Sequence, residues 1–135
     1  MEVEFGKLAE SKGSSSAVKE FGARMVKDHT RLNKELGSAA TSIGLTAPTG
    51  LSTEQKAEYA KLSKLTGKEF DKEYIDLMVK DHTDDLAAFQ KAESTVQDPK
   101  LKKAISVAIP VIQEHLNMAK ADATKLGVSL SAVQK

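Results

Sequence analysis

The hexapeptide MVKDHT occurs twice in this chain, at residues 25–30 and again at residues 78–83. Each copy carries a histidine, His29 or His82, and the chain has one further histidine, His115. A neutral imidazole nitrogen is a frequent ligand of transition metals, and the same group can act as a general base near neutral pH. The chemistry of this chain is therefore expected at its three histidines.

The three histidines occupy core positions of helical patterns. Apolar residues recur at steps of three and four before and after each histidine, which is typical of a helix with one buried face. His29 fills the gap in the stripe formed by Val18, Phe21, Met25, Leu32, Leu36, Ala39 and Ile43. The midpoint between His82 and His115 falls at Asp98-Pro99, where the chain is expected to turn, so an antiparallel hairpin would bring both rings to one height. We therefore predict three imidazoles at one level inside a bundle.

Breaker and capping residues divide the chain into the helices that would position these rings. We expect long or bundle-forming helices at about residues 2–12, 17–43, 68–97 and 99–126, the last ending at Gly127. The connection between the second and third of them is long. It contains a loop rich in Gly and Pro at residues 44–52 and a shorter helix that starts at the capping box Ser52-Thr53-Glu54-Gln55 and runs to about Leu65.

This pattern predicts an all-α fold, a four-helix bundle of ferritin-like arrangement with a long crossover that contains the short extra helix. The crossover is long enough to return along the bundle, so the second and third bundle helices would run parallel. Residues 1–127 form a single domain in this interpretation, and residues 128–135 form a C-terminal tail.

Composition excludes several classes of function. The chain has 135 residues, of which 40% are apolar and 29% are charged. Its net charge of +1 is too small to indicate binding to nucleic acid or to an acidic membrane surface. The absence of cysteine removes disulfides, thiolate catalysis and cysteine-ligated zinc. No segment reaches the roughly 20 apolar residues of a transmembrane helix. Charged residues begin at Glu2, so no signal peptide is predicted, as in a sequence trimmed of an upstream leader.

Two interpretations of the histidine level remain open. In one, the imidazoles form a hydrogen-bonded polar layer that fixes the register of the helices. In the other, a single divalent transition metal, zinc, iron or copper, satisfies all three lone pairs at once. Met25, Met78 and Met118 each lie within a turn of a histidine, which is compatible with copper, although methionine at such spacing is also common core filler. Under both interpretations the buried rings would have lowered pKa values, and stability would fall below about pH 6.5.

Four carboxylates are candidates for supporting the metal. Asp28, Asp81 and Glu114 each precede a histidine by one residue and thus lie about 100° around the helix from it. This placement suits a hydrogen bond to a histidine of the adjacent helix better than shared ligation of one ion. Glu2 is the first-helix carboxylate nearest the histidine level, and we include it as a candidate fourth ligand.

Three segments of the chain, AVKEFGARMVKDHT, LTGKEFDKEYIDLMVKDH and IPVIQEHL, resemble the signature segments of a ferritin-like domain of unknown function. That domain is widespread in exported bacterial proteins that are often labelled outer-membrane proteins. The resemblance covers about residues 2–126 and implies a four-helix bundle, a removed signal peptide, and a location in the periplasm or cell envelope. It implies no activity. The chain departs from the di-iron pattern of true ferritins, because the residues three before its histidines are Val26, Val79 and Ile112.

Three classes of function follow from these observations. The first is a metal-binding bundle for storage, buffering or sensing, whose partner is the metal ion. The second is a structural or interaction module with a metal-free histidine layer, and the chain leaves a homo-oligomer open. The third is an enzyme that uses a histidine as a base, but no nucleophile, phosphate-binding glycine loop or paired carboxylates are placed by spacing to support it. Sensitivity to chelators separates the first two classes.

Overall fold

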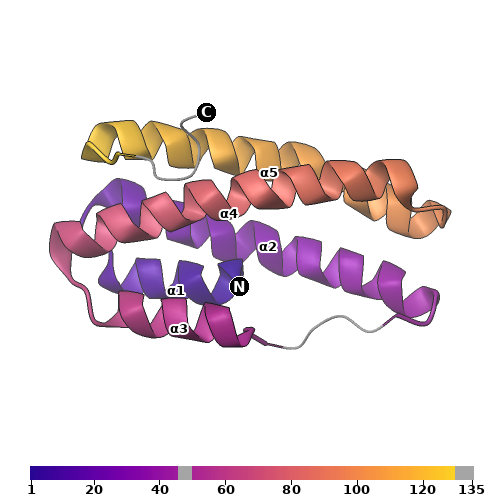
Figure 1. The fold of residues 1–135 in the computed structure, drawn as a ribbon, viewed down its shortest axis with the longest axis horizontal. Coiled ribbons are helices and arrows are strands. Elements are labelled where there is room, and N and C mark those ends of the chain that lie inside the picture. Colours follow the sequence, from indigo (N-terminus) through magenta and orange to yellow (C-terminus); the bar gives the residue numbers. More distant parts are fainter. Residues whose placement is uncertain (46–49, 130–135) are drawn as a thin grey trace.

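The computed structural model describes residues 1–45 and 50–129, and within these residues it has five helices and no strand. The helices are α1 (Glu2–Lys12), α2 (Ser16–Ser42), α3 (Thr53–Ser63), α4 (Gly67–Thr95) and α5 (Pro99–Leu126). Helices α2 and α4 run in one direction, and α1, α3 and α5 run in the opposite direction (Figure 1). The predictions of an all-α fold, of a short helix in the long connection and of parallel second and third bundle helices are confirmed.

The helix ends follow from the capping residues that the sequence places there. The Ser15 hydroxyl accepts a hydrogen bond from the Val18 backbone N–H, and the predicted capping box of Ser52 and Gln55 is complete. The Asp98 carboxylate caps α5 in front of Pro99, and Gly127 ends α5 in the left-handed conformation, with φ of 68°. The helix bounds differ from the predicted ones by at most two residues.

The predicted loop and tail lie partly outside the described residues. Residues 46–49 of the loop and residues 130–135 of the tail are not described. Val128, the first residue of the predicted tail, packs against the main core cluster. None of the helices in the described part of the chain is both long and apolar enough to cross a membrane.

The core divides into two parts because α1 is short. Helix α1 has 11 residues, whereas α2, α4 and α5 have 27, 29 and 28. The main cluster lies where α1 covers the other helices and includes Phe5, Phe21 and Tyr74, and a smaller cluster at the other end is formed by Leu32, Ala108 and Ile112 (Figure 1). Ile43, predicted as a core position, is 42% exposed, and that prediction is wrong because α2 ends at Ser42 and Ile43 is its C-cap residue, outside the helical stripe.

A buried carboxylate fixes the turn between α1 and α2. The two oxygens of Asp71, on α4, accept hydrogen bonds from the backbone N–H groups of Ser14 and Ser15 at 2.8 and 2.9 Å. These N–H groups precede the first turn of α2 and have no partner within the helix. Asp71 thereby holds the α1–α2 hairpin against α4 and sets the height of Glu2 at the opposite end of α1.

Helices α1 and α2 approach closely through Gly6 and Gly22. A Cβ atom built on either glycine would lie 2.7 Å from the carbonyl oxygen of the other. Both facing atoms belong to helical backbone and have little freedom to move. A glycine at each of these positions is therefore required for α1 to pack at its observed distance from α2.

We expect Gly22→Ala to lower the free energy of unfolding by about 1–3 kcal/mol, because the new methyl group overpacks a backbone contact. Gly37→Ala is the matched control in the same helix. Apart from the chain neighbours and the nearby backbone of the same helix, no described atom lies within 4 Å of a Cβ at Gly37, so alanine there should raise stability by up to about 1 kcal/mol. Urea unfolding of both variants measures the difference, and equal effects of the two substitutions would contradict the close approach.

Candidate metal centre

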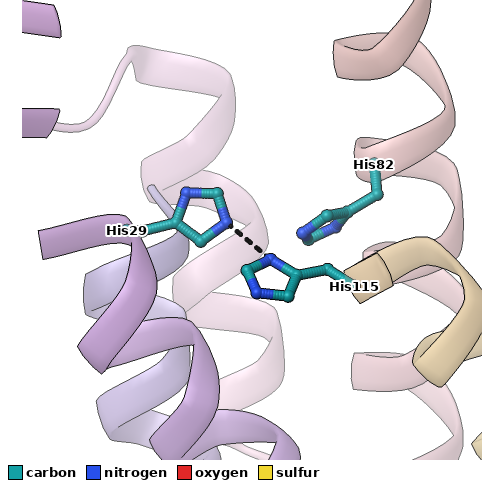
Figure 2. Close-up of side chains that lie close together, drawn as sticks. All are labelled: His29, His82 and His115. Carbon is teal, nitrogen blue, oxygen red and sulfur yellow. Dashed lines mark hydrogen bonds between the residues drawn. The ribbon is translucent and has the colours of Figure 1, made fainter. Parts of the chain in front are cut away.

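The three histidine side chains meet inside the bundle. Figure 2 shows His29 from α2, His82 from α4 and His115 from α5 with their rings directed toward one another. The ring centroids are 5.1 Å apart for His29 and His115 and 5.6 Å apart for each of the other two pairs. His29 is 5% exposed, and the other two are fully buried. The prediction of three imidazoles at one level is confirmed.

The ring nitrogens are close enough to share one ion. Each histidine offers one nitrogen such that the three atoms lie within 4.8 Å of one another. In a tetrahedral site with metal–nitrogen distances of about 2.0–2.1 Å, two ligand nitrogens are separated by about 3.3 Å. The Nδ1 atom of His115 and the Nε2 atom of His29 already lie 3.3 Å apart.

His82 presents a lone pair to this space. Its Nδ1 atom lies 2.9 Å from the backbone carbonyl oxygen of Met78, which can only accept, so Nδ1 carries the proton and donates it. The Nε2 atom is then unprotonated. It is buried and has no hydrogen-bond partner among the residues that the structure describes. An unsatisfied buried acceptor costs about 1–3 kcal/mol, so a ligand that occupies it would be stabilising.

The protonation of His115 is fixed by Asp28. The Nε2–H of His115 donates a 2.7 Å hydrogen bond to the Asp28 carboxylate, which leaves the Nδ1 lone pair facing His29. In the metal-free protein the Nε2–H of His29 completes the contact by donating to that lone pair. A metal that binds both atoms would require His29 to carry its proton on Nδ1 instead.

Asp28 is itself held by a chain of charges. Arg24 donates through Nε to Asp28 at 2.6 Å and through a terminal nitrogen to Glu114 at 2.9 Å. Burial alone would raise the pKa of Asp28, but its hydrogen bonds with His115 and Arg24 outweigh this effect and lower the pKa. Asp28 is therefore a carboxylate at neutral pH and keeps the proton on Nε2 of His115. The expectation that Asp28 accepts a hydrogen bond from a histidine of an adjacent helix is confirmed, and the donor is His115.

The same expectation is wrong for Asp81 and Glu114. Glu114 has an exposed side chain and pairs with Arg24 rather than with an imidazole. Asp81 Oδ2 lies 3.8 Å from Nδ1 of its neighbour His82, whose proton goes to Met78, and it has no hydrogen-bond partner in the described part of the chain. Two identical hexapeptides thus give their aspartates different surroundings.

Asp81 belongs to a second group of possible ligands. Its carboxylate and those of Glu2 and Asp85 offer oxygens within 4.8 Å of one another. Protonated Asp85 shares a hydrogen bond with the Glu2 carboxylate, and Glu2 also interacts electrostatically with His29. Glu2, predicted as a fourth ligand, therefore lies beside the histidines and among carboxylates.

Burial dominates the titration of both groups. It lowers the pKa of each histidine, and for His82 the pKa falls to about 4 with the help of the charge on His29. Burial also raises the pKa of Asp81 to about 7 and that of Asp85 to about 8, with the charge of Glu2 adding to both shifts. The imidazoles are therefore neutral at pH 7, which is the state that binds metal.

Sequence reasoning missed Arg24 and Asp85, although a signal for both is present. Arg24 lies four residues before Asp28, and Asp85 lies four residues after Asp81, so each is one turn away on the same helical face. The corresponding positions of the other copy hold Leu77 and Leu32. The residues that flank the hexapeptides, rather than the hexapeptides themselves, distinguish the two aspartates.

Comparison with protein families gives one match. The model described as Domain of unknown function (DUF4142) matches residues 1–121, which include the three histidines and all the carboxylates described above. Comparison with curated proteins and with solved structures gave no match.

We expect the unfolding free energy of the metal-free protein to fall as the pH rises from 6.5 to about 8. Above the ordinary histidine pKa of 6.5 the imidazoles are neutral in both states. Asp81 and Asp85 still hold protons in the folded state in this range, whereas their ordinary pKa of 3.8 leaves them ionised in the unfolded chain. The folded protein therefore binds more protons than the unfolded chain in this range, and the free energy of unfolding decreases as the pH rises. Urea unfolding with EDTA present measures the slope.

Two variants identify the groups that cause the loss of stability above pH 6.5 and below it. Asp85→Asn should flatten the loss above pH 6.5. His82→Gln should instead reduce the loss of stability that the wild-type histidines cause as the pH falls from 6.5 toward 4. A wild-type curve that is level above pH 6.5, or one that Asp85→Asn leaves equally steep, would show that these carboxyl groups are ionised in the folded protein.

Proposed function

We propose that this chain, which belongs to the family of domains of unknown function DUF4142, binds one divalent transition-metal ion through His29, His82 and His115. The observation that carries the proposal is the buried, unprotonated Nε2 of His82, which has no partner among the described residues. The bound ion would be held for storage, buffering or sensing rather than for catalysis. The ferritin-like relationship and an envelope location, which the sequence resemblance implies, belong to this proposal.

The energetics of burial support a ligand at this site. The N–H groups of His82 and His115 donate outside the cluster, to Met78 and Asp28, so the one hydrogen bond between the rings, in the part of the chain that the structure describes, joins His29 and His115. A metal ion would accept all three lone pairs at once. Its binding would replace one unsatisfied acceptor and one hydrogen bond by three coordinate bonds.

The donor set favours a borderline metal. Imidazole suits zinc, copper, iron and nickel, whereas magnesium and calcium prefer oxygen ligands. Three histidines leave at least one coordination position, which we assign to a water molecule. Glu2, which the sequence made a candidate fourth ligand, interacts electrostatically with His29 and lies among carboxylates, and we place it on the approach to the centre rather than among the final ligands. The apolar residues three before each histidine do not supply the carboxylates of a di-iron site, so we propose a mononuclear centre. Buried Met25 and Met78 make copper a metal to compare with zinc and iron.

The second candidate function is a structural bundle with a metal-free histidine layer. The hydrogen bonds from His29 to His115 and from His115 to Asp28 favour it, because they satisfy two of the rings without an ion. They leave the Nε2 of His82 unexplained, and for this reason we rank it second. A homo-oligomer is compatible with either function.

Protein purified without chelators or affinity metals should contain, or take up, one zinc, copper or iron ion per chain. At a free metal concentration of 100 times the dissociation constant, binding should raise the free energy of unfolding by about 2.7 kcal/mol, and EDTA should reverse this gain. Elemental analysis and thermal unfolding measure the two effects. His82→Gln should abolish both while retaining the helical circular dichroism spectrum. A folded wild-type protein that takes up none of the three metals would favour the structural layer.

Asp28→Asn should weaken metal binding by about 10- to 100-fold, because the amide no longer holds the proton on Nε2 of His115 through a charged hydrogen bond. Lys27→Gln, which changes the charge of an exposed neighbour, is the control and should bind normally. Competition with a chromophoric chelator gives the affinities. Wild-type affinity in Asp28→Asn would mean that His115 is oriented without this carboxylate.

A further inference from the structure

A hollow of about 1190 Å³ opens beside the N-terminal end of α1. Its walls come from α2, from the start of α3 and from α4, and the short α1 leaves this part of the bundle uncovered (Figure 1). The polar side chains in the wall include Glu2, Asp81 and Asp85, and one cationic side chain, Lys56, also lines it. The hollow is therefore an opening to solvent whose inner wall carries carboxylates.

These carboxylates adjoin the histidine centre as well as the hollow. Asp81 precedes His82, and its Oδ2 atom lies 3.8 Å from the His82 ring. The charge of Glu2 acts on both His29 and His82 and opposes the lowering of their pKa values. The three carboxylates thus connect an open space to imidazoles that are almost completely closed off from solvent.

Unsatisfied polar atoms mark the same place. In the described residues, the buried side-chain atoms without a hydrogen-bond partner are Tyr74 Oη, Asp81 Oδ2 and His82 Nε2. All three belong to α4, and the side chains of Tyr74 and His82 are fully buried. Buried polar groups are normally satisfied, so the orphaned Asp81 Oδ2 and His82 Nε2, which belong to adjacent residues, point to a ligand that passes or stays between the carboxylates and the imidazoles.

The two groups have complementary electrostatic properties. The imidazoles are neutral and exert no long-range attraction on a cation, whereas an ionised carboxylate at the mouth of a cleft concentrates cations and accelerates their association, and Glu2 carries that charge at pH 7. Carboxylates are also suitable first ligands for a hydrated ion, because each water oxygen that leaves the ion is replaced by a carboxylate oxygen. The amino group of Met1, 3.6 Å from Glu2, offsets part of the negative charge.

We propose that Glu2, Asp81 and Asp85 form a loading site that captures a hydrated divalent cation from the hollow and passes it to His29, His82 and His115. This inference rests on the proposed function, since it describes the route to the same metal centre. The carboxylates increase the rate at which the ion is taken up, whereas the imidazoles determine the equilibrium affinity of the centre. The captured ion exchanges water for carboxylate oxygens first and then exchanges carboxylate oxygens for imidazole nitrogens.

The test measures the rate of Co²⁺ uptake by stopped-flow absorption, because Co²⁺ bound by nitrogen ligands reports on itself in the visible spectrum. We expect the double variant Glu2→Gln with Asp85→Asn to take up Co²⁺ at least about tenfold more slowly than the wild type. Its equilibrium affinity should stay within about threefold. Asp84→Asn is the matched control: it is the same change one position away, on an exposed side chain outside the wall of the hollow, and should load at the wild-type rate.

Salt gives a second measurement that needs no variant. Rising ionic strength should slow wild-type loading, because it screens the carboxylates, and should leave the loading rate of the double variant nearly unchanged. Equal loading rates in the wild type and the double variant would overturn the loading site and leave the metal centre intact. An affinity loss with an unchanged rate would make the carboxylates final ligands and would also overturn it. A wild-type protein that binds no Co²⁺ and none of the metals named above would overturn the proposed function itself.

Discussion

The burial of three neutral imidazoles at one level is the constraint on which the rest of this structure depends. A buried imidazole needs a donor for one nitrogen and an acceptor for the other, and in this arrangement the three rings do not satisfy one another, because one hydrogen bond joins two of them and the Nε2 of His82 has no partner in the described residues. The protein supplies Met78 for one ring and Asp28 for another, and both contacts leave the remaining nitrogen unprotonated and directed inward. The hydrogen bonds around the three rings therefore leave nitrogen lone pairs that could hold a metal ion.

The short first helix determines how this centre meets solvent. Where α1 is present, the bundle has a continuous core of large side chains, and Asp71 and the two facing glycines hold α1 in place. Beside the N-terminal end of α1, residues of α2, α3 and α4 line a hollow, and the carboxylate of Glu2 lies in its wall. The histidines are buried, and the carboxylates of Glu2, Asp81 and Asp85 separate them from the hollow.

Much of the fold was predictable because the relevant signals are local. Capping residues, breakers and apolar spacing fixed the helix bounds within two residues, and the symmetry of His82 and His115 about the Asp98-Pro99 turn placed their rings at one height. The neighbours of the carboxylates were not predictable in this way. They depend on which helices are adjacent and on how they are rotated, so Asp28 was assigned correctly, whereas Asp81 and Glu114 were not.

The position of Ile43 and the role of Asp85 illustrate the same distinction. Ile43 continues the spacing of the α2 stripe, but it follows the last helical residue, Ser42, and is exposed there. Asp85 stands on the same face as Asp81, yet its importance becomes visible only when Glu2 is brought beside it from the start of the chain.

The two copies of MVKDHT have a consequence for comparing relatives of this protein. An alignment that scores the copies as equivalent would equate Asp28, which an arginine keeps ionised, with Asp81, which lies among other acids. The diagnostic residues are those one helical turn from each aspartate: Arg24, directly before the first copy, and Asp85, two residues after the second. A relative that keeps both hexapeptides but loses either flank would retain the two histidines and lose one of the two aspartate environments, so the flanks are the positions by which subgroups of the family could be told apart.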